Sequence, residues 1–90
     1  MPASSELATV VRLPENVALH ARPAGMFVRE AARAVAEIRV EANGRSANAK
    51  SILDVLALGA TGGTELVMSA SGADAAEALE RLAELVSSLT

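Results

Sequence analysis

One histidine and a nearby arginine are the residues of this chain best suited to do chemistry. His20 lies in the run Ala18-Leu19-His20-Ala21-Arg22-Pro23-Ala24-Gly25, two positions before Arg22. Proline is tolerated in the first turn of a helix, so the run predicts a loop that becomes a helix near residue 21. The free N–H groups and the dipole of a helix start attract anions. A phosphoryl group on His20 would meet these donors and the guanidinium of Arg22, so phosphoryl transfer is one chemistry that these residues could perform.

A plainer interpretation of the same residues stays open. A lone histidine near a helix start is commonly an exposed side chain or a helix cap. Pro23 also disfavours helical dihedrals for Arg22, so either His20 or Arg22 could cap the predicted helix. From position and residue type alone, the helix-cap interpretation is the more frequent of the two.

The composition of the 90 residues excludes several other classes of site. There is no cysteine and only one histidine, so we expect neither thiol chemistry nor a metal site. Aromatic residues make up 1% and the net charge is −3, which argues against nucleic-acid binding. No apolar run reaches the roughly 18 residues of a membrane span. We therefore expect a cytoplasmic protein that does not insert into a membrane.

The hydrophobic pattern predicts seven elements in the order β-α-β-β-α-β-α. Alternation predicts strands over residues 7–13, 37–41, 45–49 and 64–70, and helical spacing predicts helices over 21–35, 51–58 and 75–89. Asn43-Gly44 is typical of a type I′ hairpin turn. Asp74 with Glu77 resembles a capping box at the start of the last helix. One-sided strands favour an α+β fold with an antiparallel sheet and helices on one face. We expect one domain over residues 6–90, after a flexible leader of residues 1–5.

The predicted helix over residues 21–35 has a basic outer face. Arg22, Arg29 and Arg33 share this face, and Met26 lies beside them on the outward side. The face is either solvated or a docking surface for an acidic partner. Five apolar residues occupy the opposite arc and should face the sheet: Ala24, Phe27, Val28, Ala31 and Val35.

The predicted short helix over residues 51–58 combines a cap with too many apolar side chains. Ser51 is a natural N-cap, and Asp54 follows three residues later. A helix of two turns cannot bury apolar residues on every side. Ile52 and Leu56 should therefore form a small exposed interaction patch.

Several motifs in this chain together resemble one family. Leu19-His-Ala-Arg-Pro-Ala24 resembles the active-site signature of HPr, the histidine-containing phosphocarrier of the phosphoenolpyruvate-dependent sugar phosphotransferase system. The resemblance covers about residues 6 to 89 and implies an open-faced β-sandwich with sheet order 1-4-2-3. Four further segments match the family in order and spacing: Asn43-Gly44, Lys50-Ser-Ile52, Leu58-Gly59 and Ser69-Ala-Ser-Gly72.

The resemblance also implies a role for individual residues. His20 matches the histidine that enzyme I phosphorylates at Nδ1, and Arg22 matches the arginine that assists the transfer. Ser51 matches the serine that an ATP-dependent kinase modifies in many bacteria. Five residues fall on the family's docking surface for enzyme I and EIIA proteins: Met26, Arg29, Ile52, Leu53 and Leu56.

The partners and the alternatives follow from the same resemblance. It implies enzyme I, EIIA domains, a serine kinase/phosphorylase and a catabolite-control regulator as partners of a monomer that binds no cofactor. We expect a carrier rather than an enzyme with its own turnover. The alternatives are a nitrogen-related branch, a purely regulatory role, or a binding module in which His20 is only a helix cap.

Overall fold

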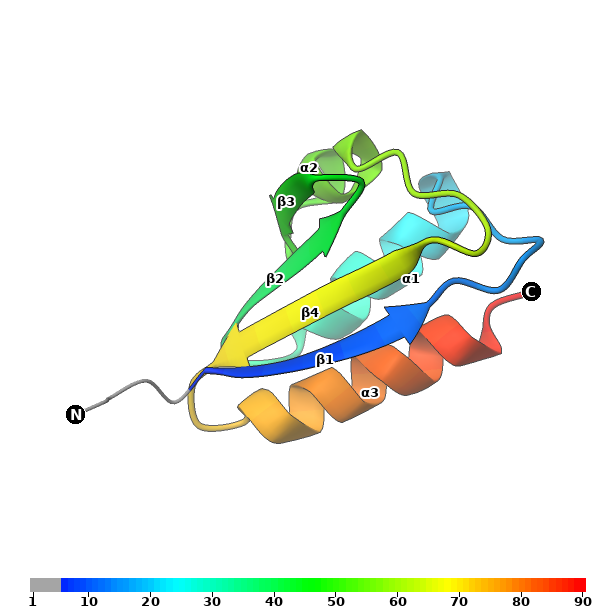
Figure 1. Cartoon of the computed structure of the whole chain (residues 1–90). Coiled ribbons are helices and arrows are strands. Elements are labelled where there is room, and N and C mark those ends of the chain that lie inside the picture. Colours follow the sequence, from blue (N-terminus) through cyan, green and yellow to red (C-terminus); the bar gives the residue numbers. More distant parts are fainter. Residues whose placement is uncertain (1–5) are drawn as a thin grey trace.

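The computed structural model describes residues 6–90 and shows four strands and three helices there (Figure 1). Their order confirms the predicted β-α-β-β-α-β-α arrangement. The predicted leader, residues 1–5, lies outside the described residues. The elements are β1 (Leu7–Arg12), α1 (Ala21–Ala32), β2 (Glu37–Ala42), β3 (Arg45–Asn48), α2 (Ile52–Ala57), β4 (Glu65–Ser71) and α3 (Ala75–Ser88).

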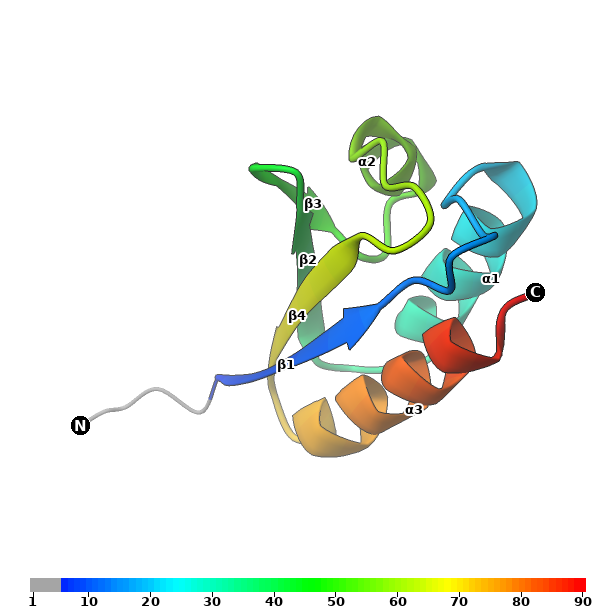
Figure 2. The same ribbon diagram turned by 45° about the vertical axis from the view of Figure 1, so that its right-hand side comes forward.

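The four strands form one antiparallel sheet in the order β1-β4-β2-β3, as the resemblance implied. β4 is central: its Ala70 lies between Leu7 of β1 and Ile38 of β2. All three helices lie on one side of the sheet, and the other side is open (Figures 1 and 2). The predicted α+β open-faced sandwich is therefore confirmed.

The core is aliphatic and lies between the sheet and the helices. Alternate residues of β2 and β4 point into it, which is the period-2 pattern of a sheet with one buried face. α1 contributes the only aromatic ring and α3 a stripe of apolar residues at helical spacing. The largest fully buried side chains are Phe27, Leu13, Ile38, Leu66, Met68, Leu82, Val40, Val55 and Val86.

The first helix is shorter than the hydrophobic pattern predicts. α1 ends at Ala32, and Val35, which was expected to face the sheet, is 84% exposed. The next residue, Ala36, is buried instead. The N–H groups of Val35 and Ala36 donate to the two carboxylate oxygens of Asp74, at 2.9 and 2.8 Å. These bonds take the place of further helical hydrogen bonds and direct the chain into β2.

The same two bonds show that the capping box predicted for the last helix is not formed. Asp74 occupies the N-cap position of α3, but its side chain makes no capping hydrogen bond. Its carboxylate instead joins the α1–β2 connection to the β4–α3 connection (Asp74 with Val35 and Ala36). The capping-box interpretation was wrong because a long-range acceptor role competes with local capping for the same two oxygens.

The carboxylate of Asp74 predicts a stability change at acid pH. The hydrogen bonds from Val35 and Ala36 hold the pKa of Asp74 below its ordinary value of 3.8. A lowered folded-state pKa gives stability that is present above the ordinary value and lost as the pH falls through the folded-state value. Asp74→Asn should lower the melting temperature at neutral pH, and the deficit should shrink below about pH 4.

Thermal melts of wild type and Asp74→Asn between about pH 7 and 2 measure this effect. Glu80→Gln is the control, because Glu80 is an exposed carboxylate of the same helix. A deficit for Asp74→Asn that does not change with pH would contradict the expected role of the carboxylate charge.

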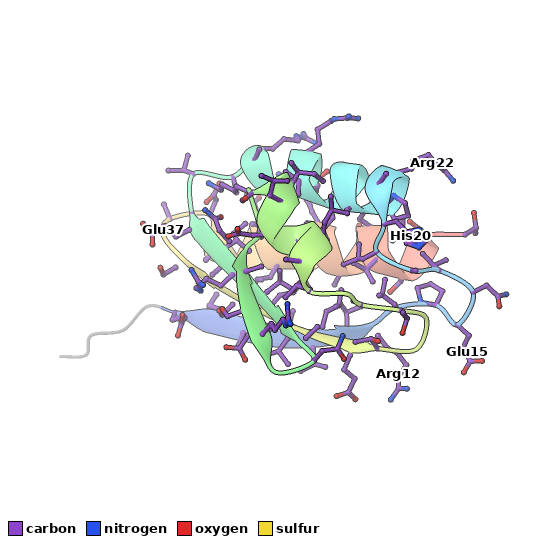
Figure 3. All side chains as sticks on the ribbon, turned by 90° about the horizontal axis from the view of Figure 1, so that it is seen from above. Arg12, Glu15, His20, Arg22 and Glu37 are labelled. Carbon is purple, nitrogen blue, oxygen red and sulfur yellow. The ribbon has the colours of Figure 1, made fainter. Side chains whose placement is uncertain are left out.

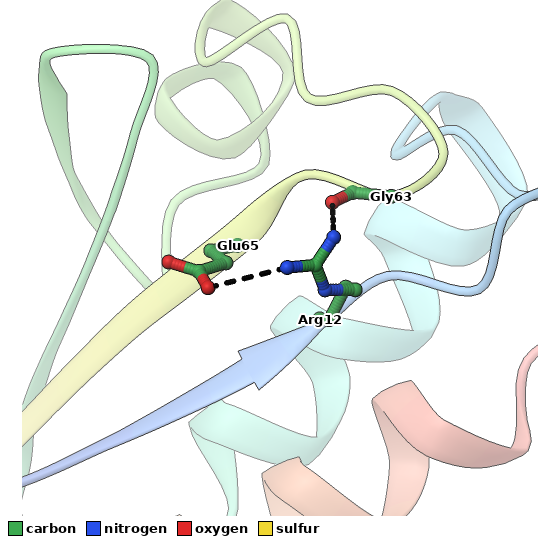
Figure 4. A network of polar contacts seen from close by, with 3 residues as sticks. All are labelled: Arg12, Gly63 and Glu65. Carbon is green, nitrogen blue, oxygen red and sulfur yellow. Dashed lines mark hydrogen bonds and ion pairs between the residues drawn. The ribbon is translucent and has the colours of Figure 1, made fainter.

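Two loops beside the end of β1 approach each other closely. A Cβ atom at Gly62 would overlap the backbone carbonyl of Glu15. The Leu13 N–H donates to the Thr64 carbonyl, and the Leu13 carbonyl accepts from the Gly63 N–H. The Arg12 guanidinium donates to the Gly63 carbonyl at 3.1 Å and to the Glu65 carboxylate at 3.4 Å (Figure 4). The loop that leads to residue 20 is therefore packed against the start of β4.

Within residues 6–90, no helix has the length and apolar character needed to cross a bilayer.

Candidate functional site

The loop before α1 holds His20 outward by burying its neighbours. Val17 and Leu19 are 4% and 3% exposed, whereas His20 is exposed. The Leu19 N–H donates to the Ala60 carbonyl at 2.9 Å, which ties this loop to the segment after α2. The backbone next to His20 is therefore held by this contact, while the imidazole ring lies in solvent (Figure 3).

His20 is the N-cap residue of α1, which answers the question that the sequence left open. Its backbone is extended (φ −98°, ψ −156°), and its carbonyl accepts the first helical hydrogen bond, from Ala24, at 2.8 Å. The imidazole itself makes no capping hydrogen bond. The N–H groups of Ala21 and Arg22 have no acceptor among the described residues, so donors remain available at this helix end.

Arg22 lies at the same end of α1 as His20 (Figure 3). It is exposed, and it forms no ion pair with another residue in the range 6–90. The first turn of α1 contains no acidic residue that would neutralise the helix dipole. The imidazole, the free N–H groups and the Arg22 side chain thus share one end of α1, and such a helix end is suited to binding a small anion.

The basic face of α1 is only partly as predicted. Arg29 is exposed, and Arg33 pairs with Glu30 of its own helix at 3.3 Å. Met26, expected on the outward side, is half-buried and packs against the core. It lines a shallow groove between α1 and α3 with Arg29 and Leu85. Only part of the Met26 side chain is therefore open to a partner.

α2 presents the exposed apolar residues that its short length predicts. Ile52, Leu53 and Leu56 are 38%, 76% and 38% exposed, and Val55 faces the core. We call the first three residues the α2 patch. Compact proteins leave such clustered apolar side chains in solvent chiefly where a partner binds.

Ser51 is the N-cap of α2, as expected. Its Oγ accepts a hydrogen bond from the Asp54 N–H at 3.3 Å. The Asp54 carboxylate does not turn toward Ser51, because it accepts from the Asn48 N–H of β3 at 3.3 Å. Asp54 therefore donates its backbone N–H to the Ser51 cap, while its carboxylate accepts from β3.

Sequence reasoning missed the side chain of Lys50. Its Nζ donates to the Ala34 carbonyl at 2.7 Å and so joins the end of α1 to the start of α2. This bond spans 16 residues and leaves no periodic signal in the sequence. Within residues 6–90, no three His, Asp or Glu side chains are grouped to hold a metal ion.

The fold and this site define a class of protein: a small open-faced sandwich that presents one histidine at a helix start, near an exposed apolar helix. The family model described as "PTS HPr component phosphorylation site" matches residues 8–88. The chain belongs to the HPr family of phosphocarriers of the phosphotransferase system.

Named relatives are similar over most of their length. The chain is 46% identical to the HPr-like protein Crh of Bacillus subtilis, over 76% of this chain and 80% of that protein. It is 43% identical to the phosphocarrier protein HPr of Vibrio cholerae, over 88% of this chain and 93% of that protein. The crystal structure of HPr from Bacillus anthracis superposes with a TM-score of 0.87 at 39% identity, over 91% of this chain and 98% of that one.

Proposed function

We propose that this protein accepts a phosphoryl group on His20 from phosphorylated enzyme I and passes it to EIIA domains. The observation that carries the proposal is the position of His20. An exposed imidazole lies at a helix start where the N–H groups of Ala21 and Arg22 have no acceptor within residues 6–90, and the first turn contains no acidic residue. Membership of the HPr family supports enzyme I and EIIA as the kinds of partner.

The chemistry is a transfer between two nitrogen or oxygen nucleophiles with no change of oxidation state. The Nδ1 lone pair of His20 forms a bond to phosphorus while the bond to the donor group of enzyme I breaks. Negative charge on the three phosphoryl oxygens is stabilised by the N–H groups at the start of α1 and by Arg22. The same steps in reverse order, with an EIIA group as nucleophile, release the phosphoryl group.

Docking is assigned to the α2 patch together with Arg29 and the exposed edge of Met26. The patch supplies apolar contact, and the arginines supply attraction to an acidic surface. Small interfaces of this mixed apolar and basic kind suit brief complexes with several partners.

The test is phosphorylation in a defined mixture. The protein is incubated with phosphoenolpyruvate and a general enzyme I, and mass spectrometry measures the gain of one phosphoryl group. Addition of EIIA should then remove it. A binding module would gain no phosphoryl group, and a protein that gained one but passed none to any EIIA would be regulatory. The 46% identity with the HPr-like protein Crh makes the second outcome worth measuring.

Arg22→Ala should slow phosphorylation of His20 by at least about tenfold, near 1.4 kcal/mol of barrier. The guanidinium is exposed and unpaired within residues 6–90, so its removal should leave the melting temperature unchanged. Arg22→Lys keeps the charge but loses the two-pronged geometry, and should fall between wild type and Arg22→Ala. Single-turnover rates measure the effect. Equal rates for wild type and alanine variant would remove Arg22 from the mechanism.

We also propose Ser51 as a regulatory site for a serine kinase/phosphorylase. A phosphate at a helix N-terminus is compatible with the fold, so it should act on docking rather than on folding. It would place nearly two negative charges beside the α2 patch. Repulsion from an acidic partner should then slow phosphorylation of His20. A catabolite-control regulator is the partner proposed for the phosphoserine form.

Ser51→Asp should reproduce this effect in weaker form, and Ser51→Ala should keep near-normal transfer. The alanine variant should lose about 1 kcal/mol of stability with its cap. Rates of His20 phosphorylation at low salt and thermal melts measure the two effects. If Ser51→Asp and stoichiometric phosphoserine both left the rate unchanged, Ser51 would be a cap only.

A further inference from the structure

We propose that the β2–β3 hairpin positions the α2 patch and the backbone beneath His20, with Asn43 and Arg45 as the positioning residues. The consequence for docking rests on the proposed function. The contacts themselves do not depend on it.

The end of α2 needs support from outside the helix. α2 has six residues, and a helix this short is marginal by itself. The last carbonyls of any helix lack partners within it. A basic residue in the last turn would stabilise the negative end of the helix dipole, but α2 has none there.

The hairpin supplies what α2 lacks. Arg45 Nη1 donates to the Ala57 carbonyl at 3.1 Å and brings a positive charge to the helix end. Asn43 Nδ2 donates to the carbonyls of Leu58 and Gly59 at 3.1 and 3.3 Å. Three consecutive carbonyls are therefore held by two side chains that come from β3 and from the turn before it.

The turn itself does not require the amide of Asn43. Asn43 and Gly44 have φ of +55° and +75°, which confirms the predicted type I′ turn. Glycine satisfies the same backbone geometry at both positions. What asparagine adds at position 43 is a donor that reaches Leu58 and Gly59.

The last carbonyl that Asn43 binds, that of Gly59, is one residue before Ala60, which holds the backbone next to His20. Ala60 follows Gly59, and its carbonyl accepts the N–H of Leu19, the residue before His20. A change at Asn43 or Arg45 should therefore loosen both the end of α2 and this contact. Neither residue is on the α2 patch or at the start of α1, so both act through their contacts with other residues.

The test compares Asn43→Gly and Arg45→Ala with Ser46→Ala. Asn43→Gly keeps the turn and removes only the amide, which guards against simple misfolding. Ser46 belongs to the same hairpin, and within residues 6–90 its Oγ accepts hydrogen bonds from Arg39 of β2 and forms none with α2. Arg45→Lys restores the charge and should recover part of the loss seen with alanine.

Two quantities are measured in the full chain. Amide hydrogen exchange at Leu58, Gly59 and Leu19 should be at least about fivefold faster in both test variants than in Ser46→Ala. The KM for phosphorylated enzyme I should rise about as much, and kcat at saturating enzyme I should fall by a smaller factor than KM rises, because neither side chain touches the imidazole.

The proposal is overturned if either the exchange rates or the KM of the two variants match those of Ser46→Ala. Wild type that accepts no phosphoryl group would overturn the proposed function instead. In that case the exchange rates alone decide whether the hairpin positions α2 and Leu19.

Discussion

His20→Ala should fold normally and accept no phosphoryl group from phosphoenolpyruvate and enzyme I. His20 is the only histidine of the chain, and its exposed ring makes no capping bond that the fold depends on. In the wild-type protein the bound phosphate should be acid-labile and alkali-stable, as a phosphoramidate is. Mass spectrometry before and after acid treatment measures both properties, and thermal melts confirm that the variant is folded.

Ser51→Ala is the matched control for this experiment. It removes the proposed ester site and should leave the acid-labile phosphate in place. If His20→Ala still gained an acid-labile phosphate, or if the wild-type label survived acid, the assignment of His20 as the acceptor would be wrong.

Gly62→Ala should lower the free energy of unfolding by about 3 kcal/mol, the upper part of the range for overpacking. The added Cβ would overlap the carbonyl carbon and oxygen of Glu15 and lie 3.1 Å from the Pro14 oxygen. Backbone atoms cannot rotate away as a side-chain tip can, and the Pro14 oxygen also accepts the Val17 N–H. The two loops must therefore move apart. Urea unfolding followed by circular dichroism measures the loss.

Gly25→Ala gives the matched comparison. Gly25 lies within α1, and a Cβ there would meet nothing within 4 Å. In a helix interior alanine is favoured over glycine by up to about 1 kcal/mol, so this variant should be as stable as wild type or more stable. If Gly62→Ala were as stable as Gly25→Ala, the close approach of the two loops would not limit stability and the prediction would be wrong.

The predictions from sequence succeeded where local pattern decides the structure. The alternation in β2 and β4, the Asn43-Gly44 turn and the Ser51 cap each depend on residues a few positions apart. The predictions for Val35 and Asp74 were wrong because these two residues bind each other across 39 positions of the chain. Helical spacing continues past Ala32 in the sequence, whereas in the structure Val35 and Ala36 donate to the distant carboxylate and the Ala34 carbonyl accepts from Lys50.

The candidate site divides in the same way. The position of His20 at a helix start and the exposed α2 patch follow from Pro23 and from the short length of α2. Met26 was placed too far outward, because helical spacing does not show how closely α3 packs beside α1. The contacts of Lys50, Asn43 and Arg45 could not be foreseen, since each joins elements through one side chain and a distant carbonyl.

The central place of β4 also sets the order in which the protein can be built. β1 is the first strand to leave the ribosome, yet its neighbour in the sheet is the last, and Arg12 and Glu65 are 53 positions apart. β2 also pairs with β4, so the β2–β3 hairpin is the only part of the sheet that can pair early. Non-local pairing of this kind slows folding. β1 must therefore stay unpaired until β4 has been synthesised, and the sheet closes only when β4 is inserted between β1 and β2.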